Sequence, residues 1–116
     1  MPIFGKKGTH YICSLQCGAG KDAHLKFELS HDYVENIEIH KLEPIICSTS
    51  KGVDPKQILE QAIEGAKQAS KDFNKNYFIK SISYIPNDSP NYDLHKRIVW
   101  EVIKHIENNG QFKELD

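Results

Sequence analysis

Two amphipathic helices separated by one strand, all between Lys51 and Glu107, most constrain the fold of this chain. Asp54 and Pro55 mark the start of the first helix, because an aspartate accepts a hydrogen bond from a free amide of the first turn and a proline there loses none. The apolar side chains that follow recur at helical spacing and predict one buried face. They are Ile58, Leu59, Ala62, Ile63, Ala66, Ala69 and Phe73.

Gly65 lies within this apolar face, although a glycine weakens a helix by about 1 kcal/mol relative to alanine. We therefore expect Gly65 to allow the close approach of a strand. The next segment, Tyr77 to Ile85, is rich in aromatic and β-branched residues and predicts a strand. Lys80, Ser81 and Ser83 interrupt its alternation, which indicates a sheet face that is only half covered.

The second helix has the same kind of start as the first, since Ser89 is a good capping residue and Pro90 follows it. Gly110 is the expected left-handed residue at its end. Trp100 lies at the edge of the apolar stripe and is expected to be a partly buried lid on the core. The stripe itself consists of Leu94, Ile98, Val99, Val102, Ile103 and Ile106.

The first part of the chain predicts antiparallel strands over residues 9–16, 24–30 and 34–40. In the second of these, apolar and polar residues alternate cleanly, which is typical of a strand with one wet face. Ile37 and Ile39 are expected to point inward in the third. Residues 42–48 extend or re-pair this strand, and Pro44 restricts them to a sheet edge or a bulge.

Strands followed by helix, strand and helix predict an α+β fold: a two-layer sandwich with a mostly antiparallel sheet and both helices on one face. The expected order is β-β-β(-β)-α-β-α. We expect a single domain over residues 9–110, with a loose leader over residues 1–8 and a loose tail over residues 111–116.

The composition excludes strong global electrostatics, because the formal net charge is -1 and the pI is about 6.6. No apolar run approaches the roughly 18 residues that span a bilayer, and the first residues lack the apolar core of a signal peptide. We therefore expect a cytoplasmic protein with no membrane contact. Cys13, Cys17 and Cys47 are an odd number and are expected to be reduced thiols.

A zinc site built from His10, Cys13, Cys17 and His24 is disfavoured by the geometry of a strand. Alternation places His10 on the face opposite to the two cysteines, and structural zinc usually uses closely spaced cysteine pairs. The glycines of residues 17–22 lack the full phosphate-loop pattern, and a strand rather than a helix follows them. We predict no metal and no cofactor.

No catalytic constellation is evident either. Cys17 and His24 lie across a turn, but no carboxylate that orients the histidine can be named. His95 and His105 are expected to lie on the wet face of the second helix. We predict that the protein is not an enzyme.

Three segments resemble a known family when they are compared residue by residue. Residues 52–56, Gly-Val-Asp-Pro-Lys, are similar to a Gly-Val-Ile-Pro-Lys/Arg helix start. Tyr77 to Ile85 takes the place of a Val-Asp-Ile-Lys-Val-Thr-Leu strand. Residues 17–27 fall where the family has Gly-Gly-Arg-Gly-Gln-Tyr-Gly-His-Val-Lys-Ile, and the glycines, His24 and Lys26 match best. Over nearly its whole length the chain resembles domain IV of translation elongation factor G.

The resemblance implies a binding end made of two loops, residues 18–24 and 87–93, because the family's equivalent loops reach into the ribosomal decoding site. Two departures weaken this inference: Ala19 replaces the family's loop arginine, and the second loop lacks the family's histidine. If the implied end exists, we expect the two loops to lie side by side. The candidate contacts are Lys21, His24, Lys26, Asn91, Tyr92 and His95.

Two classes of function follow from these observations. The first is a non-enzymatic binding domain that acts on RNA or the ribosome through the paired loops. The alternative is a protein-interaction or inhibitor-like module that uses an exposed sheet face or strand edge. A contiguous positive patch at the loop end would favour RNA, and an apolar patch would favour a protein partner.

Overall fold

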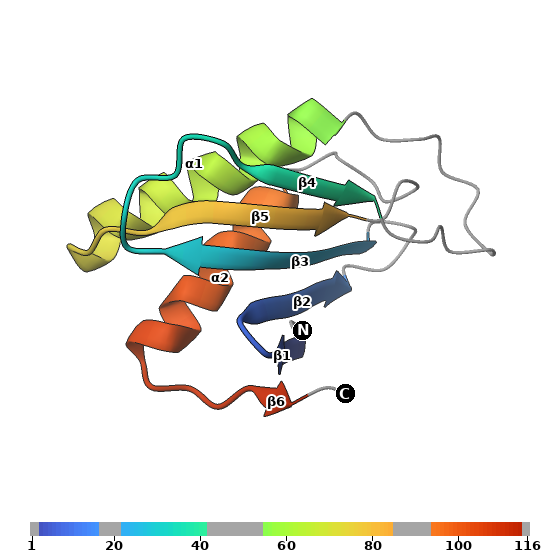
Figure 1. The fold of residues 1–116 in the computed structure, drawn as a ribbon. Coiled ribbons are helices and arrows are strands. Elements are labelled where there is room, and N and C mark those ends of the chain that lie inside the picture. Colours follow the sequence, from blue (N-terminus) through green and yellow to red (C-terminus); the bar gives the residue numbers. More distant parts are fainter. Residues whose placement is uncertain (1–2, 17–21, 42–54, 85–93, 115–116) are drawn as a thin grey trace.

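A computed structural model describes residues 3–16, 22–41, 55–84 and 94–114 of the chain, which form a sheet and two helices (Figure 1). The elements match the predicted order for most of the chain. They are β1 (Ile3–Lys7), β2 (His10–Gln16), β3 (Asp22–Ser30), β4 (Glu38–Lys41), α1 (Pro55–Phe73), β5 (Phe78–Tyr84), α2 (Leu94–Glu107) and β6 (Lys113–Glu114).

The sheet has six strands in the order β4-β5-β3-β2-β1-β6, and both helices lie behind it on one face (Figure 1). The predicted α+β class with two helices on one face is therefore confirmed. The sheet is mixed, however, rather than mostly antiparallel, because β4 pairs parallel with β5 and β1 pairs parallel with β6. β4 and β5 run parallel because α1 lies between them in the sequence and carries the chain back to the end of the sheet at which β4 began.

Both ends of the chain are more ordered than predicted. Residues 3–7 form β1, which pairs with β2 across a tight turn that contains Gly8 with φ of 60°. The loose leader is therefore wrong for these residues, and the loose tail is wrong for β6. The physical reason is a ring cluster that ties the ends to α2: Phe4 stacks on His105 at 4.2 Å, and Phe112 meets both rings edge-on.

The core lies between the sheet and the helices, and α1 and α2 pack directly against each other at Gly65. A Cβ atom at this position would overlap the carbonyl oxygen of Lys96 and lie 3.0 Å from the Cβ of Val99. Gly65 therefore permits the close approach of α2, not of a strand as the sequence predicted. The fully buried large side chains are Phe27, Leu25, Ile58, Ile82, Ile98, Ile103, His95, Val99, Val102 and Cys13.

Asparagine, rather than glycine, takes the left-handed conformation just after each helix. Asn74 has φ of 55° and Asn109 has φ of 56°. Gly110 is not the left-handed residue, and its amide instead donates to the carbonyl of His105 at 2.8 Å. A side chain at Gly110 would collide with the His105 ring, so the glycine leaves room for that ring. Trp100 is a partly buried lid, as predicted.

The third predicted strand is shorter than expected, because residues 31–37 cross the end of β5 before β4 begins. This crossing, here called the β3–β4 segment, is required because β5 lies between β3 and β4 in the sheet. His31 Nδ1 lies 2.9 Å from the carbonyl oxygen of Asn76 and fixes the segment there. Ile37 is half-buried. Ile39 pairs with Ile82 and so lies on the helix side of the sheet, as predicted, although it is 41% exposed on the edge strand.

Candidate functional site

The sheet face turned away from the helices, here called the open face, carries most of the polar strand residues. No described helix or strand packs on it (Figure 1). Residues paired across neighbouring strands share a face, so the register gives the composition of each row. One row crosses all six strands and consists of Lys113, Gly5, Ile12, Lys26, Ser83 and His40. The next row consists of Lys7, His10, Glu28, Ser81 and Glu38.

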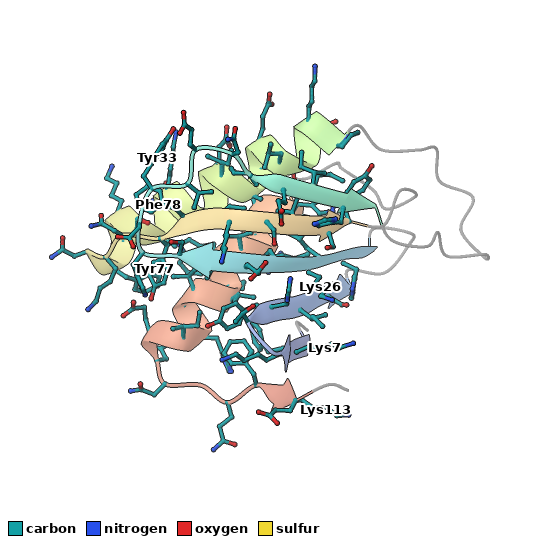
Figure 2. The ribbon with its side chains drawn as sticks, viewed as in Figure 1. Lys7, Lys26, Tyr33, Tyr77, Phe78 and Lys113 are labelled. Carbon is teal, nitrogen blue, oxygen red and sulfur yellow. The ribbon has the colours of Figure 1, made fainter. Side chains whose placement is uncertain are left out.

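Positive charge exceeds negative charge on the open face. Lys7, Lys26 and Lys113 come from three different strands and form no ion pair with any residue that the structure describes. Figure 2 shows these three lysines together in the lower right of the view. A fourth, Lys80, is the unpaired residue of a bulge beside Glu28. Among the strand positions that the register assigns to this face, the acidic residues are Asp22, Glu28 and Glu38.

Glu28 is held by bonds within the protein. Its carboxylate accepts hydrogen bonds from Thr9 Oγ1 and Ser81 Oγ, each at 2.8 Å, and lies 3.1 Å from His10 Nε2. Partial burial alone would raise the pKa of Glu28, but the two hydrogen bonds and the nearby His10 and Lys80 outweigh it and hold the pKa below its usual value. The carboxylate is thus partly neutralised by its neighbours.

Two of the predicted contact residues, His24 and Lys26, lie on the open face. His24 Nδ1 is 2.6 Å from Ser14 Oγ, and both side chains are half-buried. Lys21, Asn91 and Tyr92 lie outside the described residues, as do residues 18–21 of the first loop and all of the second loop. The side-by-side placement of residues 18–24 and 87–93 therefore stays a prediction.

His95 is not on the surface, so its predicted contact role and wet position are wrong. Its side chain is 0% exposed, and its backbone amide donates to Gln61 Oε1 at 3.1 Å. The reason is helical spacing: His95 precedes Ile98 and Val99 by three and four residues and shares their buried face. His105 is also packed rather than solvated, since it is half-buried and its Nε2 lies 2.6 Å from the carbonyl oxygen of Gln111.

The described residues contain no group of three or more His, Cys, Asp or Glu side chains that could hold a metal ion. Cys13 is buried beneath the helices, whereas His10 lies on the open face, as strand alternation predicted. Burial, with a smaller contribution from Glu101, raises the pKa of the Cys13 thiol to about 12. This thiol is therefore protonated at neutral pH and unsuited to bind a metal or attack a substrate. Cys17 lies outside the described residues, so the absence of zinc stays a prediction.

Sequence reasoning missed the surface around the β3–β4 segment. Tyr33 is 77% exposed there, and its ring meets that of Phe78 edge-on, with centroids 5.9 Å apart (Figure 2). A pocket of about 380 Å³ lies between this segment, α1 and the start of β5, with Ile37 and Ile63 in its wall. A second cleft of about 520 Å³ lies beside Tyr33 and Lys80. The only sequence signal was the single aromatic residue Tyr33 after the polar pair His31 and Asp32.

Comparison with known proteins identified no relative of this chain. We found no match to the chain among protein-family models, curated proteins or solved structures. The resemblance to domain IV of elongation factor G therefore rests on the three sequence segments given above. Neither helix in the described part of the chain is long and apolar enough to cross a membrane.

Proposed function

We propose that this protein is a non-enzymatic RNA-binding domain that acts through the open face of its sheet. The observation that carries the proposal is the excess of lysines on a face that neither helix covers, in a chain whose formal net charge is -1. Phosphate groups are recognised largely by lysine and arginine, and a local basic surface is sufficient for such contacts.

The distribution of charge supports a phosphate-binding role for three lysines in particular. Glu28 already interacts with Thr9, Ser81, His10 and Lys80. Lys7, Lys26 and Lys113 have no comparable partner among the described residues, so their ammonium groups remain available to a polyanion. Because they belong to β1, β3 and β6, they follow a line across the strands rather than along one of them.

The resemblance to domain IV of elongation factor G points in the same direction. In that family the two equivalent loops reach into the ribosomal decoding site, and we propose that residues 18–24 and 87–93 extend the open face in the same manner. Lys21, Asn91 and Tyr92 would then add contacts beyond Lys26 and His24. An RNA or ribosome partner would also place the protein in the cytoplasm.

The test is a titration of fluorescently labelled single-stranded RNA at several salt concentrations. For single strands, each lost phosphate contact changes the slope of log K against log salt by about 0.7. We expect the combined Lys7→Ala, Lys26→Ala and Lys113→Ala variant to flatten the slope by about 2. The matched control, Lys67→Ala with Lys71→Ala and Lys75→Ala, removes the same charge from exposed positions on and just after α1. Undetectable binding by the wild type, or an equal effect in the control, would refute the proposal.

A protein partner is the second candidate, and the 380 Å³ pocket favours it. Its wall contains Val34, Ile37, Ile63 and Ile79 together with the rings of Tyr77 and Phe78, a composition suited to an apolar side chain of another protein. Affinity purification with and without ribonuclease separates the two candidates. A partner that is retained after ribonuclease treatment and lost in Ile37→Lys would support this second function.

A further inference from the structure

We infer that the cleft beside Tyr33 binds one unpaired base of single-stranded RNA, which stacks on the Tyr33 ring while Lys80 contacts the neighbouring phosphate. The inference rests on the proposed function, since it assumes that RNA lies on the open face. It goes further by naming the form of RNA that is bound and the residue that takes up a base.

Tyr33 has the accessibility and the support that stacking requires. Its side chain is 77% exposed, and Phe78 supports it from one edge at an interplanar angle of 83°. The backbone beneath it is held at two points: His31 Nδ1 lies 2.9 Å from the Asn76 carbonyl oxygen, and the Asp32 amide donates to Ser30 Oγ at 3.1 Å. A ring held in this way loses little conformational entropy when a base stacks on it.

An exposed tyrosine alone would not indicate a binding site, but Tyr33 also lies beside a cleft. It measures about 520 Å³, with Leu29 and Val34 as apolar contacts and Asn36 as a side-chain amide. A nucleobase has the same mixed character, with apolar faces and polar edges. Unpaired bases in RNA are recognised in this way, by stacking on aromatic rings and by hydrogen bonds to their edges.

The charges around the cleft indicate which part of a nucleotide enters it. Glu35 and Glu38 line the cleft, and their carboxylates would repel a phosphate group but not an uncharged base. Lys80 also lines it and lies beside Glu28 on the open face. The base therefore enters the cleft, and the phosphate remains at Lys80, toward the open-face lysines.

The position of Tyr33 also indicates a single strand rather than a duplex. Figure 2 shows Tyr33 and Phe78 at the upper left of the molecule and Lys7, Lys26 and Lys113 at the lower right, so that a bound chain would cross the sheet diagonally. Bases inside an A-form duplex are paired and stacked on one another, and their faces are not available to a side chain. Sequence-tolerant binders of single strands combine a basic path with aromatic stacking in this way.

The experiment uses a single-stranded oligoribonucleotide that contains 2-aminopurine, whose fluorescence falls when it stacks. We expect the wild type to quench this signal. Tyr33→Ala should abolish the quenching and weaken binding by roughly 5- to 150-fold. It should leave the salt dependence unchanged, because no phosphate contact is lost. Tyr33→Phe retains the ring and should retain both quenching and affinity.

The control is the affinity of the same variants for duplex RNA of equal length. If Tyr33→Ala binds single strands as tightly as the wild type, the base site is refuted while the RNA-binding open face stands. If it weakens duplex and single-strand binding equally, the loss is structural and the inference also fails. If the wild type binds neither RNA, both the inference and the proposed function are wrong.

Discussion

At the scale of single residues, Glu28 is the group whose ionisation is most clearly linked to folding. Its pKa is lowered in the folded state by hydrogen bonds and nearby positive charge, which outweigh the effect of partial burial. A carboxyl group with a lowered pKa adds stability above its ordinary pKa of about 4.3, and this stability is lost as the pH falls through the folded value.

We therefore predict that the wild type loses stability more steeply than Glu28→Gln when the pH falls from about 5 to about 3. Glutamine keeps the acceptor oxygen but cannot be protonated in this range. The measurement is the urea midpoint at each pH. Parallel curves for the two proteins would show that Glu28 has an ordinary pKa in the folded state.

Gly65→Ala provides a second prediction at this scale. Alanine is the better helix former by about 1 kcal/mol, so an exposed site would gain stability. At Gly65 the new methyl group overlaps the carbonyl oxygen of Lys96, which belongs to the backbone of α2 and cannot rotate away. We expect a net loss of roughly 1 to 3 kcal/mol in the free energy of unfolding. Lys67→Ala, at an exposed position of the same helix, is the control, and a stabilised Gly65→Ala would contradict the contact.

At the scale of elements, local patterns predicted both helices and the central strands, because periodicity and capping are local properties of the sequence. They missed β1 and β6, which depend on pairing between distant residues and on the contacts of Phe4 and Phe112 with His105. They also attributed the irregular pattern of β5 to a sheet face that is only half covered. The bulge at Lys80 accounts for it, since one extra residue shifts Ser81 and Ser83 to the open face while Ile82 and Tyr84 face the core.

The candidate site was predicted less well than the fold. His24 and Lys26 were placed on an exposed strand face by simple alternation, and the structure agrees with that placement. The prediction for His95 was wrong because it gave more weight to the polar side chain than to the helical spacing between His95 and Ile98. Tyr33 was missed because it lies in the segment that crosses the end of β5. This crossing depends on the order of the strands in the sheet, which the sequence does not show.

Ile98→Asp is the prediction that tests the contact between α2 and the rest of the core. Ile98 is 0% exposed, and an unpaired carboxylate there costs several kcal/mol against a total stability of roughly 5 to 15 kcal/mol. We expect loss of cooperative thermal melting. Arg97→Asp, at the exposed neighbouring position, should still melt cooperatively. Ile63→Asp should be milder than Ile98→Asp, because Ile63 is only half-buried in the wall of a pocket.

At the scale of the whole molecule, the side chains that stabilise the fold and the charged surface residues lie on opposite faces of the sheet. The apolar side chains face the helices, whereas the lysines and histidines of the strands lie mainly on the other side of the sheet. We therefore predict that the combined Lys7→Ala, Lys26→Ala and Lys113→Ala variant melts within a few degrees of the wild type. A large drop in its melting temperature would mean that these lysines support the fold, and a loss of RNA binding in this variant would then have a structural explanation.

The parallel pairing of β1 with β6 has a consequence for the order of folding. Gly5 pairs with Lys113, so this contact closes almost the entire chain into one loop, and such closure carries a high entropic cost. β6 is also only two residues long and exposed. It should therefore join the sheet last and leave it first, with amide hydrogens that exchange with solvent well before those of β3 and β5. The chain would thus pass repeatedly through a five-stranded form in which the outer edge of β1 is free to accept another strand.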